Sequence, residues 1–135
     1  MPTTINPVVH FRDLEARARF LVETFGFEQR EAHKDPGGSL VYVELALEGA
    51  PLGVGSTTEG SMFDLGPTSV YISRDEVDSM HQRAVAAEAE ILMAPTDQDY
   101  GSRDFIARDP EGNLWCFGTL EADNFVLGLV AHRAP

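Results

Sequence analysis

The stretch at residues 99–118, DYGSRDFIARDPEGNLWCFG, carries most of the information about the fold. Residues 103–108 within this stretch and residues 114–119, which extend one position beyond it, favour β-strands. Between them stands Asp109-Pro-Glu-Gly-Asn113, whose Asp, Pro, Gly and Asn residues are typical of a tight turn. The stretch therefore predicts a β-hairpin.

A weak internal repeat surrounds this hairpin. HFRDLEARARFLVETFGFE, from His10, aligns with ISRDEVDSMHQRAVAAEAE, from Ile72, at an offset of 62 residues. Each copy starts with a β-prone run, INPVVHF or TSVYIS, and then places Asp13 or Asp75 at a predicted helix N-cap. Apolar residues recur on one face of each predicted helix: Leu14, Leu21 and Phe25, then Val77, Met80, Ala84 and Ala87.

Strands are predicted after each helix. Gly26 is predicted to end the first helix, and Glu88 or Ala89 takes that place in the second copy. The predicted strands are residues 28–32, 40–47 and 51–55 in the first copy, and residues 90–93, 103–108 and 114–119 in the second. The order β-α-β-β-β therefore occurs twice, and residues 56–67, rich in Gly, Ser and Thr, link the copies.

With these motifs in this order, the sequence resembles the vicinal oxygen chelate superfamily of glyoxalase I, bleomycin-resistance proteins and related dioxygenases. INPVVHFRD, FGFE, DYGSRDF, ARDPEGN and LWCFG carry the resemblance over roughly residues 5–120. It implies an α+β fold in which two tandem βαβββ units form an incomplete barrel with the helices outside. We expect one domain over residues 1–135, with unit one at about 4–56, a linker at about 57–67, unit two at about 68–120 and a tail at 121–135.

Composition limits the classes of partner. The chain has 135 residues, 22 acidic and 10 basic side chains and a formal net charge of −12. Such a charge repels nucleic acid and anionic lipid and attracts a cationic ligand. The single cysteine, Cys116, excludes an internal disulfide, and no apolar run is long enough to cross a bilayer. We expect a cytoplasmic protein without nucleic-acid or membrane partners.

Alternation of side chains along the strands predicts which residues face the concave ligand site that the resemblance implies. The predicted ligand-binding residues are Asn6, Val8, His10, Tyr42, Glu44, Ser69, Tyr71, Phe105 and Cys116. Aromatic walls suit flat or cationic ligands, although each ring serves equally well as core packing. Arg103 is predicted to anchor its own loop by bonding carboxylates.

The resemblance also implies where a metal would bind, at the start of each unit's first strand and on the inward face of each unit's last strand. Asn6, Ser69 and Cys116 stand at three of these places, and residues 51–55 (PLGVG) offer no ligand at the fourth. One amide, one hydroxyl and one thiol are a poor donor set for a divalent ion. We therefore expect no metal and no cofactor.

Three functions fit this pattern. The first is a binding protein that sequesters a small cationic or aromatic drug or metabolite, as bleomycin-resistance proteins do. The second is a metal-independent lyase or isomerase in which His10, Glu44 or both transfer protons, unless the two only form the pocket wall. The third is an assembly domain with a vestigial pocket. Family members are commonly homodimers, and residues 125–130 (FVLGLV) would pack on a partner or on their own barrel.

Overall fold

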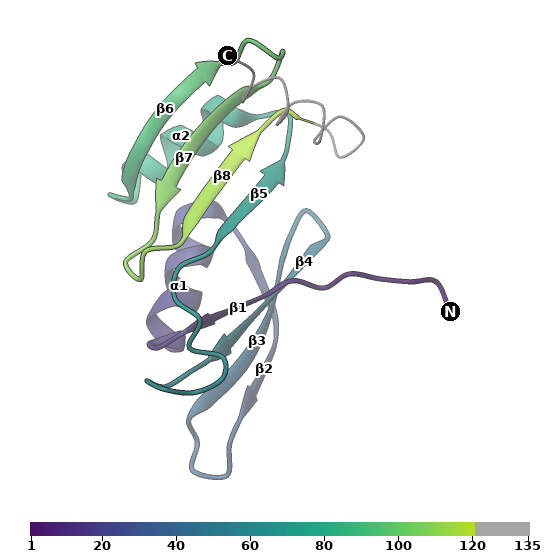
Figure 1. Cartoon of the computed structure of the whole chain (residues 1–135), viewed down its shortest axis with the longest axis vertical. Coiled ribbons are helices and arrows are strands. Elements are labelled where there is room, and N and C mark those ends of the chain that lie inside the picture. Colours follow the sequence, from purple (N-terminus) through teal and green to yellow (C-terminus); the bar gives the residue numbers. More distant parts are fainter. Residues whose placement is uncertain (121–135) are drawn as a thin grey trace. The chain divides into compact units, whose positions relative to one another are not determined.

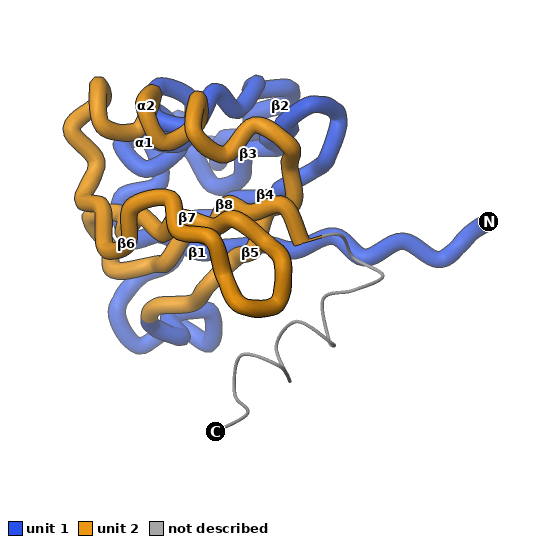
Figure 2. The backbone as a smooth tube through the Cα atoms, turned by 90° about the horizontal axis from the view of Figure 1, so that it is seen from above, with its two compact units in different colours: residues 1–66 blue, residues 67–135 orange. Residues whose placement is uncertain are grey.

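The computed structural model describes residues 1–120, which form two compact units that divide between Gly66 and Pro67 (Figure 2). The tail at 121–135, with the apolar residues 125–130, lies outside the described residues. None of the helices in the described part of the chain has the length and apolar character that a membrane span requires.

Each unit has the order β-α-β-β-β (Figure 1). Unit 1 contains β1 (Val8–Phe11), α1 (Leu14–Phe25), β2 (Glu28–Lys34), β3 (Leu40–Leu47) and β4 (Ala50–Ser56). Unit 2 contains β5 (Ser69–Ser73), α2 (Val77–Ala86), β6 (Glu90–Asp97), β7 (Arg103–Arg108) and β8 (Leu114–Gly118). The sheets have the strand orders β1-β4-β3-β2 and β5-β8-β7-β6, so the first strand of each unit lies parallel to its last. The predicted α+β fold of two tandem βαβββ units is confirmed.

A helix covers one face of each sheet. In unit 1 the strand residues under α1 are fully or almost fully buried, and they include Val9, Phe11, Val43, Leu45 and Val54. In unit 2, α2 lies against β6, β7 and β8 and covers Phe105, Trp115 and Phe117, all with no exposed surface. Because side chains alternate along a strand, these buried residues leave their neighbours on the opposite, open face of each sheet.

The repeat is not uniform at the residue level. The carbonyls of Pro7 and Thr68 accept the equivalent parallel-strand hydrogen bonds, from Gly53 and Leu114, and are 61 positions apart. The helices begin at Leu14 and Val77, which are 63 positions apart. Unit 2 therefore has two extra residues between the start of its first strand and the start of its helix, and the single offset of 62 is an average of two registers.

These extra residues change the start of the second helix. Asp13 is the N-cap of α1, as predicted, and its side chain accepts a hydrogen bond from the backbone N–H of Ala16 at 3.3 Å. The prediction that Asp75 caps α2 is wrong. Glu76 is the N-cap there and makes no capping side-chain bond, because the longer connection moves Asp75 one residue ahead of the cap.

Candidate functional site

The open face of unit 1 presents Val8, His10, Tyr42 and Glu44, as predicted from alternation. Val8 and Glu44 both pair with Gly53, and His10 and Tyr42 both pair with Gly55. A Cβ atom at Gly53 would overlap the Tyr42 hydroxyl, and one at Gly55 would come within 2.9 Å of the His10 ring. The two glycines of β4 therefore let both rings lie against bare backbone.

A segment at residues 57–66, here called the cover segment, packs on this face. The Phe63 ring stacks on the His10 ring, with centroids 4.6 Å apart and planes 13° from parallel. Arg12 makes two hydrogen bonds to the Asp64 carboxylate, at 2.8 and 3.1 Å, and Asp64 also accepts from the Gly60 backbone N–H. The Arg12 bond holds the pKa of Asp64 below its ordinary value. The sequence pattern predicted only a linker for these residues.

The open face of unit 2 contains a buried carboxylate. Asp104 is only 5% exposed and accepts from the hydroxyls of Tyr71 at 2.8 Å, Ser102 at 3.0 Å and Tyr100 at 3.2 Å. These four residues are here called the carboxylate cluster. Tyr71 was predicted to face the site, whereas Asp104, Tyr100 and Ser102 were not. Alternation from Cys116, which pairs with Ile106 in the adjacent strand, places Asp104 on the same face and would have found it.

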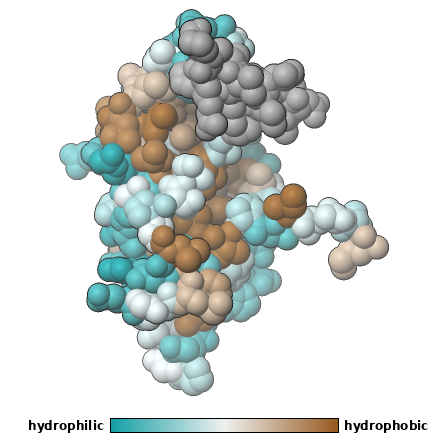
Figure 3. Space-filling view, viewed as in Figure 1, coloured by the Kyte–Doolittle hydropathy of each residue, from teal (hydrophilic) through white to brown (hydrophobic). Residues whose placement is uncertain are grey.

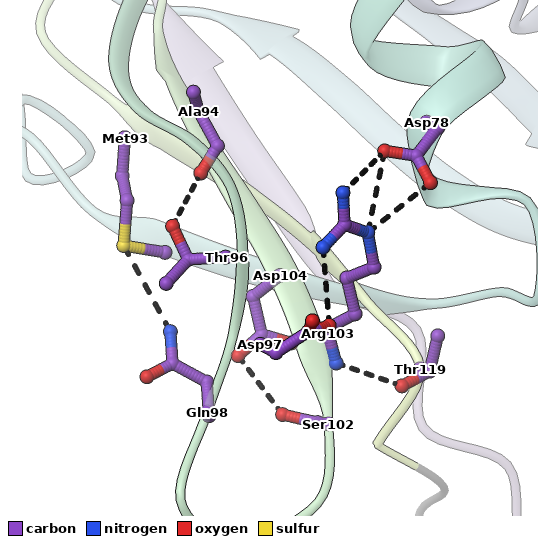
Figure 4. A network of polar contacts seen from close by, with 10 residues as sticks. All are labelled: Asp78, Met93, Ala94, Thr96, Asp97, Gln98, Ser102, Arg103, Asp104 and Thr119. Carbon is purple, nitrogen blue, oxygen red and sulfur yellow. Dashed lines mark hydrogen bonds and ion pairs between the residues drawn. The ribbon is translucent and has the colours of Figure 1, made fainter.

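The cluster is held from three sides. The Tyr71 hydroxyl accepts the backbone N–H of Leu120 at 3.2 Å. Gly118 pairs with Asp104, and a Cβ atom there would overlap both the Asp104 carboxylate and the Tyr71 hydroxyl. Figure 4 shows the Ser102 hydroxyl directed at Asp104 from the β6–β7 turn. The carboxylate is therefore fixed before any ligand arrives.

Neutral groups alone bond this carboxylate in the described part of the chain. Burial, and then the Asp104 bond, raise the pKa of Tyr71 above its ordinary value of 10.0, so its hydroxyl stays a donor. Burial, and then the charge of Asp104, also raise the pKa of the half-buried Cys116 thiol. Burial of an acidic group produces shifts of this sign, and a neighbouring negative charge adds to them.

The neighbouring Arg103 does not supply that cation. Its guanidinium bonds Asp78 at distances from 2.9 to 3.3 Å and Asp97 at 3.1 Å, while its backbone N–H donates to Thr119 (Figure 4). The expectation that Arg103 anchors its loop through carboxylates is confirmed. The pairing ties β7 to the first turn of α2.

Other predicted residues lie elsewhere. The placement of Phe105 on the concave side is wrong: its ring stacks on Phe117 at 5.1 Å and meets His81 of α2, because residues next to Asp104 in β7 point to the opposite face. Asn6 lies before β1, not in it, and bonds Thr4. Ser69 is exposed at the start of β5. His10 and Glu44 share a face but make no bond to each other in the described structure, because they pair with different glycines of β4.

The residues at the implied metal positions do not fit a metal. Asn6 bonds Thr4, Ser69 offers a hydroxyl, Cys116 has a raised thiol pKa that disfavours the thiolate ligand, and residues 51–55 (PLGVG) offer no ligating side chain. Within residues 1–120, no three His, Cys, Asp or Glu side chains come together as metal ligands. We derive no chemistry through a metal.

Comparisons with known proteins agree with this fold. The sequence profile of the Glyoxalase/Bleomycin resistance protein/Dioxygenase superfamily matches residues 5–117. An uncharacterised protein of Mycobacterium bovis is 26% identical over 84% of this chain and 81% of its own length. Among solved structures, TioX from Micromonospora sp. ML1 has a TM-score of 0.71 at 24% identity, covering 87% of this chain and 98% of TioX. Lactoylglutathione lyase from Agrobacterium tumefaciens has a TM-score of 0.67 at 23% identity, covering 87% and 93%.

Proposed function

Because this chain belongs to the glyoxalase/bleomycin resistance protein/dioxygenase superfamily, we propose that it binds and sequesters a small organic cation, a drug or a metabolite, at the open face of unit 2. The observation that carries the proposal is the carboxylate cluster. We include in the proposal a metal-free site, a cytoplasmic location and a homodimer.

The charge of the Asp104 carboxylate favours a cationic ligand. A buried carboxylate is normally paired with a cation, because hydroxyl donors replace its hydration but not its charge. Asp104 is almost fully buried and, among residues 1–120, is bonded only to hydroxyls, in a chain of net charge −12. A protonated amine or an aromatic cation would supply the missing charge, and the half-exposed Tyr71 ring beside it suits a cation.

The lyase or isomerase alternative has less support. Proton transfer by a pair requires both groups to reach the same bound substrate. The His10 ring lies between Phe63 and Gly55, and Glu44 makes no bond to it in the described structure. This arrangement gives no reason to assign proton transfer to His10 and Glu44, and it is equally compatible with two residues that line the site.

The test is a fluorescence titration with proflavine, a planar organic cation, and with 9-anthracenecarboxylate, a planar anion. We expect proflavine to bind and Asp104→Asn to weaken it by about tenfold or more, since a charge partner is lost. Asp99→Asn, which removes the same charge from an exposed site in the adjacent turn, is the matched control and should change binding by less than about twofold. Equal binding of the anion, or an unchanged affinity in Asp104→Asn, would contradict the proposal.

A second measurement addresses the metal-free part of the proposal. Thermal-shift titration with Zn, Ni, Mn and Fe should leave the melting temperature unchanged, because a ligand that binds only the folded state raises it. A stoichiometric metal after purification without chelator, together with such a rise, would favour an enzyme.

A further inference from the structure

We propose that the His10 face now covered by Phe63 is a second binding subsite, for a flat uncharged aromatic ring, and that the cover segment at residues 57–66 is its built-in competitor. This inference rests on the proposed small-molecule binding and adds unit 1 to it. The site is the juxtaposition of His10, Gly55 and Tyr42 across neighbouring strands, with Phe63 above His10.

The floor of the subsite suits a ring. His10 and Tyr42 lie in one cross-strand row with Gly55 between them, and the glycine leaves its backbone uncovered. Neither ring makes a hydrogen bond in the described structure; the Tyr42 ring has a tilted contact with the His33 ring, with centroids 5.9 Å apart. The close, nearly parallel stack of Phe63 on His10 demonstrates that this face accepts a flat ring.

The cover segment is attached in a way that a ligand can displace. Phe63 is 48% exposed, and its neighbours Met62 and Leu65 are 80% and 82% exposed, so this part of the segment lies outside the core, whereas Thr57 at its start is buried. Apolar residues at the surface are visible among hydrophilic ones in Figure 3. A side-chain tie of the segment is the ion pair between Arg12 and Asp64, in which the arginine side chain is 60% exposed and the aspartate side chain 14% exposed. Solvent at the arginine end weakens this pair, and a ligand ring could replace the Phe63 stack directly.

The first test detects the stacking of Phe63 on His10 without a ligand. The ring current of Phe63 should move the carbon-bound ring protons of His10 upfield in the NMR spectrum of the full chain. Phe63→Leu should abolish that shift, and Asp64→Asn should reduce it by opening part of the population. Met62→Ala, an exposed change in the same segment, is the control and should leave the His10 signals in place. If the wild-type His10 signals match those of Phe63→Leu, Phe63 does not cover His10 and the proposal is wrong.

The second test uses quinoline, which is uncharged at neutral pH, followed by ligand-observed NMR. Phe63→Ala should tighten quinoline binding by about three- to tenfold, because the competitor no longer occupies the open state. His10→Ala in the Phe63→Ala background should remove the gain, and Met62→Ala should not produce one. Unchanged or weaker binding in Phe63→Ala would reject the subsite. Since quinoline carries no charge, this outcome is separate from the proflavine result at Asp104, and either proposal can fail while the other stands.

Discussion

The open faces of the two units share a backbone plan and differ in chemistry. In both, glycine in the last strand makes room for the end of a long side chain, Gly53 for Tyr42 in unit 1 and Gly118 for Tyr71 in unit 2. Tyr42 makes no hydrogen bond in the described structure, whereas Tyr71 bonds both Asp104 and Leu120. Unit 1 therefore has rings that lie under the cover segment, and unit 2 has a prearranged carboxylate. The repeated backbone gives two open faces, and the side chains give each face a different chemistry.

The turns offer the largest test of this difference. Asp35 in unit 1 and Asp109 in unit 2 both begin five-residue turns in which the first N–H bonds the fifth carbonyl. Asp109 is 3% exposed, and its carboxylate also accepts from Asn113 and from the Trp115 indole at 2.9 Å. Asp109→Ala should lower the free energy of unfolding by about 3 kcal/mol, since buried donors lose their partner. Asp35→Ala, at an exposed turn, should lower it by about 1 kcal/mol. Urea unfolding followed by circular dichroism measures both, and equal losses would refute the contrast.

The glycines under the two tyrosines give the next largest effect. Gly118→Ala should destabilise the protein by about 2 kcal/mol, because the new methyl group collides with a carboxylate and a hydroxyl that are already bonded to each other. Gly53→Ala should lower stability by about 1 kcal/mol, because the Tyr42 hydroxyl has no bond to lose when it moves aside. Paired chemical denaturation curves check the order, and a larger loss at Gly53 would reverse our interpretation.

The Tyr71 hydroxyl makes stability depend on alkaline pH. Its folded pKa lies above the ordinary 10.0, so the folded state retains a proton that the unfolded chain loses. This contribution is complete below pH 10.0 and is lost as the pH rises beyond it. Tyr71→Phe should lower stability at neutral pH by about 1 kcal/mol and flatten the alkaline decline. Tyr42→Phe serves as the control, because the Tyr42 hydroxyl makes no hydrogen bond in the described structure. An identical decline in wild-type protein and Tyr71→Phe would disprove the assignment.

The helix ends supply the smallest effect. Gly26 ends α1 in the left-handed conformation, with φ 81°, and Glu88 adopts φ 62° after α2. Glycine takes this conformation without strain, whereas a side chain does not. Gly26→Ala should therefore destabilise by about 1 kcal/mol, and Glu88→Gly should stabilise by about 0.5 kcal/mol. Thermal unfolding compares the two, and a loss in Glu88→Gly would mean that its side chain contributes more than its backbone strain removes.

Local patterns predicted most of the fold. The alternation in residues 40–47 and 103–108 identified two strands with their final bounds, and the predicted apolar face of each helix is buried except for Ala87, which is exposed after the end of α2. The strands β2 and β6 run further than predicted, to Lys34 and Asp97, because pairing with the neighbouring strand extends them beyond their own apolar pattern. The prediction that Asp75 caps α2 was wrong because a single offset of 62 residues was used for a repeat in which unit 2 has extra residues before its helix.

The sequence by itself determined the two βαβββ units, their turns and the residues on most of the open face, since these depend on periodicities of a few residues. Only the tertiary structure decided the chemistry of the faces. Tyr71 reaches Asp104 across 33 positions, and Arg12 reaches Asp64 across 52. Local periodicity carries no record of such contacts, because they form only when strand pairing and the close approach that glycine allows bring distant side chains together.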